Sequence, residues 1–271
     1  MHLHPPMADE LITSAKNPKI RRLLELQQKS SLRRAEGIFV VEGLRELRHC
    51  LEAGFKLESL FYCPGICARP ELGRESFAEK ESIFALSPEA YSRIAVRDSS
   101  EGVVATVHSR CLSLAELSLP SNPLVIVLES VEKPGNLGAV LRSADAAGAD
   151  ALLVCDPLTD LYNPNLIRAS LGAVFTVPSV CCSSSQAISF LKEKGIRILT
   201  AQLQDSSLYY DTDMTRGTAL VMGTESTGLT GEWREAADAH IRIPMNGKMD
   251  SLNVSVSAAI LMFEAVRQRN G

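Results

Sequence analysis

From residue 122 onward, short runs rich in Val, Ile and Leu alternate with stretches of helical pattern. Strands that helices cover on both faces form continuous apolar runs, whereas half-exposed strands alternate apolar and polar residues. Alternating strands and helices build a parallel sheet. The sequence therefore predicts an α/β fold with a parallel sheet for this half of the chain. The four runs are PLVIVLES (123–130), ALLVCD (151–156), GIRILTAQ (195–202) and TALVMG (218–223).

A smaller α/β module is predicted ahead of this sheet, in residues 1–108. Helical patterns occur at 13–34, 44–54 and 87–95, and the short apolar runs between and after them are typical of strands. The stretch that follows contains SLAELSLPSNP (113–123), whose Ser, Pro and Asn content favours a connector. We therefore expect a first domain at 1–108, a linker at 109–121 and a second domain at 122–271.

Bulk composition excludes several classes of protein. With 45% hydrophobic residues the chain can form a full core, yet no run approaches the roughly 18 apolar residues of a membrane span. The first residues have neither a basic nor an apolar signal region, so we expect a cytoplasmic protein. Seven scattered cysteines show no paired metal-ligand spacing, and we predict no structural zinc or other metal.

Charge is distributed unevenly along the chain. The net charge is −4, but residues 11–34 carry seven basic side chains against one acid, a local charge of +6. Such a patch attracts a polyanion to one face, although a solvated helix surface explains it equally well from charge alone. The candidate RNA contacts in this segment are Arg21, Arg22, Arg33 and Arg34.

Three segments marked by glycine and asparagine, at 133–150, 222–229 and 243–268, follow or contain apolar runs. Small residues at such turns let the backbone approach a ligand closely, and nearby polar residues supply directed contacts. The first segment contains PGNLGA in place of the G-x-G-x-x-G pattern of dinucleotide-binding proteins, and no P-loop pattern occurs. A nicotinamide enzyme is therefore a poor second choice.

The last helical pattern, from Val254, has two apolar stripes. One contains Val254, Ala258, Leu261 and Ala265, and the other contains Val256, Ile260, Phe263 and Val266. One stripe can cover the sheet of its own domain, while the second needs another partner. We expect that partner to be a second copy of the chain, in a homodimer.

Together, the three segments resemble the motifs of the SpoU (TrmH-like) RNA ribose methyltransferases, a branch of the SPOUT superfamily. The resemblance covers residues 122–271, and residues 1–108 resemble the ribosomal protein L30e-like substrate-binding domain often found before it. The matched positions are Asn136, Gly138 and Arg142 in the first motif, Gly223, Glu225 and Gly228 in the second, and Ile243, Pro244, Met245, Ser251, Leu252, Asn253, Val254 and Ser255 in the third.

The resemblance implies a fold and a cofactor. The C-terminal part of the family's parallel sheet is threaded into a deep trefoil knot, a rare exception to unknotted connections. Loops of the second and third motifs hold S-adenosylmethionine (SAM) in this family. By resemblance, Gly223, Ile243 and Leu252 contact the cofactor, and Met245 and Thr200 are weaker candidates for the wall of the same pocket.

The implied reaction is methyl transfer to a ribose 2′-hydroxyl of RNA. Arg142 is the matching essential arginine, and we hypothesise that it binds phosphate and stabilises the nascent alkoxide, because guanidinium hardly deprotonates in proteins. Asn136, Glu225 and Asn253 complete the expected catalytic set, and Arg168 is a further candidate RNA contact. The accessory domain favours large-subunit ribosomal RNA over transfer RNA; a catalytically silent RNA-binding assembly factor is the alternative of a different class.

Overall fold

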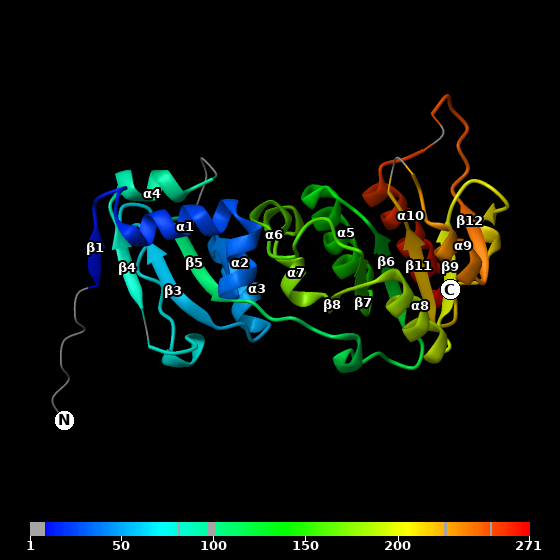
Figure 1. Cartoon of the computed structure of the whole chain (residues 1–271), viewed down its shortest axis with the longest axis horizontal. Helices are drawn as coiled ribbons and strands as arrows, with labels where there is room; N and C mark the ends of the chain where they lie inside the picture. Colours follow the sequence, from blue (N-terminus) through cyan, green and yellow to red (C-terminus); the bar gives the residue numbers. More distant parts are fainter. Residues whose placement is uncertain (1–8, 81, 97–100, 225–226, 250) are drawn as a thin grey trace. The chain divides into compact units, whose positions relative to one another are not determined.

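The computed structural model describes residues 9–80, 82–96, 101–224, 227–249 and 251–271 (Figure 1). The chain forms two compact units. The first ends at Arg110 and also includes Tyr162–Pro164, whereas the second comprises Cys111–Leu161 and the residues from Asn165 onward. Leu117, which lies in the segment predicted as a linker, is buried in the core of the second unit.

In its described part, the first unit contains a five-stranded mixed sheet in the order β1-β4-β3-β5-β2. β4 runs parallel to β1 and β3, and β5 runs antiparallel to β3 and β2. The strands are β1 (Glu10–Ile12), β2 (Ile38–Glu42), β3 (Leu57–Tyr62), β4 (Ile83–Leu86) and β5 (Val103–His108). The helices are α1 (Pro18–Gln28), α2 (Ser30–Glu36), α3 (Leu44–Glu52), α4 (Pro88–Ile94) and the short 3₁₀ helix η1 (Arg74–Ser76).

The single helix predicted at 13–34 is wrong, because the segment forms two helices. Asn17 caps α1 by accepting a hydrogen bond from the amide of Lys19, and Pro18 occupies the first helical position. Lys29 then adopts an extended conformation that separates α1 from α2. The guanidinium of Arg33 donates to the carbonyl of Leu26 at 2.6 Å, so it satisfies an end of α1 that would otherwise lack a partner.

The second unit is built on a seven-stranded parallel sheet, as far as it is described, in the order β10-β12-β9-β11-β6-β7-β8. Its strands are β6 (Leu124–Glu129), β7 (Ala151–Cys155), β8 (Ser179–Cys182), β9 (Arg197–Ala201), β10 (Ser207–Leu208), β11 (Thr218–Met222) and β12 (Ala239–Arg242). Its helices are α5 (Pro134–Ala147), α6 (Pro164–Ser170), α7 (Ala173–Thr176), α8 (Ser184–Glu193), α9 (Gly231–Ala236) and α10 (Val254–Asn270), with 3₁₀ turns η2 (Leu114–Glu116) and η3 (Tyr209–Asp211).

Helices cover both faces of this parallel sheet, which confirms the predicted α/β class. α8 and α9 pack on one face, where Trp233 of α9 is fully buried and donates from Nε1 to Ser184 Oγ at 3.0 Å. α5 and α10 pack against each other, and α10 also contacts β11 (Figure 1). The four strands predicted from apolar runs are β6, β7, β9 and β11.

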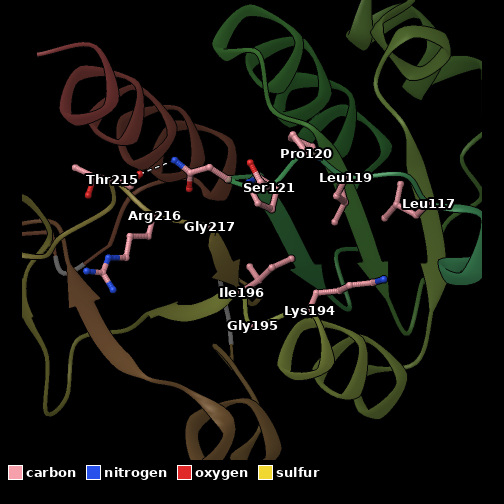
Figure 2. A pocket seen from close by; sticks show the side chains of 12 residues that line it. Leu117, Leu119, Pro120, Ser121, Lys194, Gly195, Ile196, Thr215, Arg216 and Gly217 are labelled. Carbon is pink, nitrogen blue, oxygen red and sulfur yellow. Dashed lines mark hydrogen bonds between the residues drawn. The ribbon is translucent and has the colours of Figure 1, made fainter.

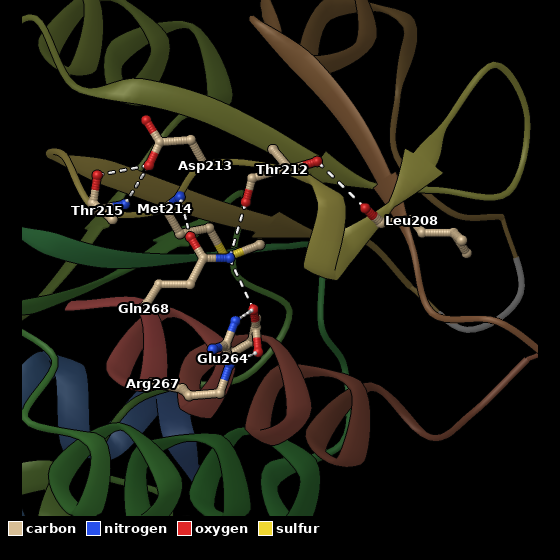
Figure 3. Close-up of polar contacts among 8 residues, drawn as sticks. All are labelled: Leu208, Thr212, Asp213, Met214, Thr215, Glu264, Arg267 and Gln268. Carbon is tan, nitrogen blue, oxygen red and sulfur yellow. Dashed lines mark hydrogen bonds and ion pairs between the residues drawn. The ribbon is translucent and has the colours of Figure 1, made fainter. Parts of the chain in front are cut away.

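The end of α10 is fastened to the chain segment before β11 (Figure 3). Gln268 accepts a hydrogen bond from the amide of Met214 at 2.8 Å and donates to the carbonyl of Thr212 at 3.0 Å. Arg269 donates to the carbonyls of Met214, Pro123 and Arg216. These contacts hold the last helix against the amino-terminal edge of the sheet, so its opposite end is fixed at the carboxyl edge.

At Gly138, α5 approaches α6 closely because the glycine has no side chain. A Cβ at this position would lie 2.6 Å from the Cβ of Ala169 and 2.7 Å from the carbonyl oxygen of Leu166. Such distances are shorter than real Cβ atoms tolerate. The glycine of the first motif therefore serves the packing of α5, and Arg142 on the same helix depends on that packing for its position.

We expect Gly138→Ala to destabilise the protein by about 1–3 kcal/mol, the usual cost of overpacking a well-filled contact. This loss should occur although alanine is the better helix former by about 1 kcal/mol. Gly135→Ala in the same helix is the matched control, because a Cβ there meets nothing within 4 Å. Urea unfolding measures both variants, and equal stabilities of the two would contradict this explanation.

Candidate active site

The three glycine- and asparagine-marked segments follow three strands of the parallel sheet. α5 begins five residues after the end of β6, and residues 223–230 follow β11. Residues 243–253 connect β12 to α10. Ligands of open parallel sheets bind beyond the carboxyl ends of the strands. The topology therefore brings all three segments to the edge of the sheet where a ligand is expected.

A hydrogen bond joins the first and third segments. Asn253 Nδ2 donates to Asn136 Oδ1 at 3.2 Å, although 117 residues separate them in sequence. Asn253 also caps α10, since its Oδ1 accepts from the amide of Ser255 at 2.9 Å and from the Ser255 hydroxyl at 2.6 Å. Two of the predicted catalytic residues thus meet, and one of them fixes the start of the last helix.

Arg142 projects from the middle of α5 and is exposed to solvent. Its guanidinium forms no hydrogen bond or ion pair with any residue that the structure describes. A charged side chain that no protein group holds is available to an anionic ligand, and a planar guanidinium suits phosphate oxygens. As far as the described residues go, Arg142 is therefore available to an anionic ligand.

The two ends of the second segment approach each other so closely that only glycine fits at position 223. A Cβ on Gly223 would lie 2.3 Å from both the carbonyl carbon and the oxygen of Gly228. Gly228 itself has φ +68°, and its amide donates to the carbonyl of Thr224 at 3.0 Å. The predicted catalytic residue Glu225 lies outside the described residues. The glycine spacing of the second motif is thus explained by the fold of the loop.

A cavity of about 140 Å³ lies at the carboxyl ends of β9 and β12. This volume is below the roughly 300–1,000 Å³ of whole ligand sites, so the cavity suits one ring of a larger ligand. Three predicted cofactor contacts, Ile243, Met245 and Leu252, line it, whereas Gly223 and Thr200 are not among its described wall residues. The other lining residues are Ala201, Gln202, Leu203, Ile241, Arg242, Ser251, Ser257 and Leu261.

Thr200 lies inside the sheet, one residue before the cavity wall. It is fully buried, and its Oγ1 is 2.6 Å from Nδ1 of His240 on the neighbouring strand β12. This hydrogen bond satisfies the threonine hydroxyl within the protein. Thr200 therefore supports the wall by holding β9 and β12 together.

A buried carboxylate that sequence reasoning missed holds the residue that follows the second segment to the sheet. Glu129, at the end of β6, accepts hydrogen bonds from the amide of Thr230 at 2.9 Å and from its hydroxyl at 2.8 Å. Ser184 also donates to Glu129, at 3.2 Å. The signal in the sequence is an acid that ends an otherwise apolar run, which requires donors if it is buried.

A larger cavity, of about 460 Å³, lies at the opposite, amino-terminal edge of the sheet (Figure 2). The segment 117–123 and the loops 194–196 and 215–217 line it, and Lys194 and Arg216 are its charged residues. It lies at the edge where the strands begin, whereas all three marked segments follow the ends of strands. The small cavity at the carboxyl edge is therefore the better candidate for the cofactor.

The predicted RNA contacts have different environments. Arg21 and Arg34 are exposed, and their guanidinium groups form no hydrogen bond or ion pair with a described residue. Arg22 is paired with Glu58 at 2.8 Å and with Glu36, and these carboxylates raise the pKa of its guanidinium. Arg21 and Arg34 are therefore the remaining candidates for RNA contact among these three arginines.

Two further candidates are partly or fully engaged in the protein. Arg33 is 4% exposed, and its guanidinium caps α1, which is a structural use of this side chain. In the second unit, Arg168 is half-buried and donates to the side chain of Asn165. Both arginines therefore have a structural explanation that needs no RNA.

Two features are absent from the part of the chain that the structure describes. No group of three or more His, Cys, Asp and Glu side chains that could hold a metal ion occurs among them. Within the same residues, no helix combines the length and apolar character needed to cross a bilayer.

The fold and the site define a class: an α/β protein with three glycine- and asparagine-marked loops, a small apolar cavity and an exposed arginine beyond the carboxyl edge of its parallel sheet. Comparison with known proteins identifies the family within this class. Residues 123–263 match the SpoU rRNA Methylase family, and residues 17–105 match an MRM3-like substrate binding domain. The chain belongs to the SpoU rRNA methylase family, which confirms the resemblance seen in its motifs.

Relatives match along nearly the whole chain. A 23S rRNA (guanosine(2553)-2′-O)-methyltransferase of Bacillus subtilis is 29% identical over 257 residues, 93% of this chain and 97% of the relative. A crystal structure of an RNA 2′-O ribose methyltransferase is 38% identical, with a TM-score of 0.82, and covers 96% of this chain and 100% of its own. An AdoMet-bound rRNA methyltransferase from Sinorhizobium meliloti is 29% identical, with a TM-score of 0.87 and coverages of 95% and 97%.

Proposed function

We propose that this protein transfers the methyl group of SAM to a ribose 2′-hydroxyl of RNA, with large-subunit ribosomal RNA as the substrate in the cytoplasm. The observation that carries the proposal is the Asn136–Asn253 hydrogen bond. It places the segment that bears Arg142 beside the segment that lines the cofactor cavity. Acceptor and donor sites are thereby adjacent, as in-line methyl transfer requires.

The residues of the cavity fit the adenosyl part of SAM. Apolar side chains, including Ile243 and Leu252, form a slot for a flat ring, and backbone groups at the strand ends are available for hydrogen bonds. When bound, SAM supplies an electrophilic methyl group on sulfur. The protein's contribution is to hold both partners and to exclude water from the slot.

Arg142 acts on the acceptor side. Its guanidinium binds an RNA phosphate and stabilises the negative charge that develops on the 2′-oxygen, because it remains protonated at neutral pH. Asn136 and Asn253 fix the two loops and present amide groups towards the acceptor ribose. Glu225 belongs to this set by its motif position, as a residue that orients Arg142 or the acceptor hydroxyl.

The proposal is tested with purified protein, methyl-tritiated SAM and unmodified 23S rRNA, with tRNA as the competing substrate. We expect label in the 23S rRNA and loss of one 2′-O-methylated nucleotide from the rRNA of a strain that lacks the protein. Label in tRNA alone would overturn the choice of RNA. SAM binding without label in either RNA would favour the silent assembly factor.

We expect Arg21→Glu/Arg34→Glu to weaken RNA binding, because each exposed arginine can release about one counterion from RNA. The slope of log Kd against log salt should fall by about 1–2, while affinity for SAM stays unchanged. A filter-binding titration in several salt concentrations measures this. Arg48→Glu/Arg74→Glu changes the charge of the same unit equally at other exposed sites; equal weakening by both pairs would argue against a localised RNA surface.

The protein is proposed to act as a homodimer through the second apolar stripe of α10. Val256 and Phe263 are 47% and 48% exposed, which is unusual for large apolar side chains on one helix. We expect Phe263→Glu to convert the dimer to a monomer in light scattering at micromolar concentration. Leu158→Glu is the control, since Leu158 is 60% exposed elsewhere in the same unit; dissociation by the control variant alone would place the interface elsewhere.

We also infer that the second unit is threaded into the trefoil knot of the SPOUT superfamily. The strand order supports this, because β11 inserts between β6 and β9 while β12 lies outside β9. The chain then returns through α10 to pack on α5. In this arrangement the loops 223–230 and 243–253 are the knot loops.

A further inference from the structure

Two cysteines lie side by side at the carboxyl ends of neighbouring strands. Cys155 is the last residue of β7 and Cys182 the last residue of β8, and the two are direct partners in the register of this parallel pair. Directly paired residues of neighbouring strands project from the same face of a sheet. Both side chains accordingly pack against the core that includes Trp233. The sheet therefore holds two free thiols next to each other.

The spacing of the two strands suits a disulfide. Neighbouring strands lie about 4.8 Å apart, and the Cα atoms of a disulfide usually lie about 4.4–6.8 Å apart. Hydrogen bonds just beyond the pair hold the strand ends in register. The amide of Asp156 donates to the carbonyl of Cys182 at 2.9 Å, and the amide of Ser184 donates to Asp156 Oδ2 at 3.1 Å. The two sulfur atoms can therefore be joined without a change of register.

The two thiols differ in exposure and in proton affinity. Cys155 is fully buried, whereas Cys182 is partly exposed. A hydrogen bond from the Cys155 thiol lowers the pKa of Cys182, and the same hydrogen bond together with burial raises the pKa of Cys155. The thiolate is the form of cysteine that attacks an oxidant, and it must be accessible to do so. Cys182 is thus suited to attack, and Cys155 is placed to resolve the product.

We propose that Cys155 and Cys182 are a redox-active pair that hydrogen peroxide converts to a reversible disulfide. The thiolate of Cys182 attacks the peroxide, takes one oxygen with its proton to become a sulfenic acid, and releases hydroxide. The sulfur of Cys155 then displaces the hydroxyl group, so that the S–S bond forms and the hydroxyl leaves with the thiol proton as water. The pair loses two electrons to the peroxide, and a thiol reductant restores it by exchange. Transient disulfides of this kind are the ones that mesophilic cytosolic proteins contain.

Peptide mapping after brief exposure of the folded protein to hydrogen peroxide tests the proposal. Free thiols are blocked with iodoacetamide, and trypsin then releases residues 143–168, with Cys155, and residues 169–192, with Cys181 and Cys182. We expect the two peptides to be joined, and dithiothreitol to separate them. Cys182→Ser should lose the joined peptides. Cys155→Ala should lose them too, and it should leave Cys182 as a sulfenic acid that dimedone labels, because the resolving thiol is gone.

Cys181→Ser is the matched control, because Cys181 is the adjacent residue of β8, is exposed, and pairs in register with Val154 instead of a cysteine. This variant should keep the joined peptides. Their absence from the oxidised natural protein, or their persistence in Cys182→Ser, overturns the proposal. Joining of residues 111–142 to residues 169–192 in their place overturns it as well, since the reactive pair would then include Cys111. The natural protein and Cys182→Ser decide the question even if Cys155→Ala does not fold.

Discussion

Arg142→Ala should lower kcat for methyl transfer to RNA by about 10²–10³-fold, the usual effect of removing one group that stabilises developing charge. The affinity for S-adenosylhomocysteine should stay unchanged, because Arg142 is not among the described residues that line the cofactor cavity. Thermal stability should also be preserved, since the side chain is exposed and holds no described neighbour. Single-turnover transfer of a tritiated methyl group measures the rate directly.

A conservative variant separates charge from geometry. Arg142→Lys keeps a cation at the same position, so it should be more active than Arg142→Ala but less active than the natural protein, because a lysine cannot bind phosphate in a bidentate manner. Arg216→Ala is the control, since Arg216 is an exposed arginine at the opposite edge of the sheet. Equal inactivity of the lysine and alanine variants, with RNA binding intact, would argue against a role for the charge.

The strongly apolar strands and the capped helices were predictable from the sequence. β6 and β11 are continuous apolar runs buried on both faces, and α5 ends at Gly148 in the left-handed conformation that glycine favours. The short strands β8 and β10 were missed, because SVCC and SL have too few apolar residues to show a period. Their pairing depends on neighbours that are distant in sequence.

Site residues that belong to a motif were predictable from the sequence. Contacts that depend on packing between distant segments were not. Asn136 and Asn253 were identified by motif position, but their contact depends on a topology that brings residues 117 positions apart together. Gln202, which lines the small cavity, was not predicted because it follows an ordinary apolar run and belongs to no motif. Arg33 was counted among the RNA contacts because composition does not show that its guanidinium turns inward to cap a helix.

Gly223→Ala should nearly abolish cofactor binding. The added Cβ would lie 2.3 Å from the Gly228 carbonyl and 2.6 Å from the amide nitrogen of Leu229, and these are backbone atoms that cannot rotate away. The contact between Gly223 and Gly228 must therefore open, which disturbs the loop that we propose holds the cofactor. If the distortion costs about 3 kcal/mol, the affinity for S-adenosylhomocysteine falls about 100-fold.

Gly231→Ala is the matched control for this loop, because a Cβ at the first residue of α9 meets nothing within 4 Å. It should bind S-adenosylhomocysteine like the natural protein. Titration calorimetry at equal protein concentration compares the two variants, and urea unfolding shows whether the sheet is intact. Gly223 lies after the end of β11 and outside the sheet. The free energy of ligand binding should therefore change more in Gly223→Ala than the free energy of unfolding. Natural affinity in Gly223→Ala would show that the loop tolerates opening and does not hold the cofactor.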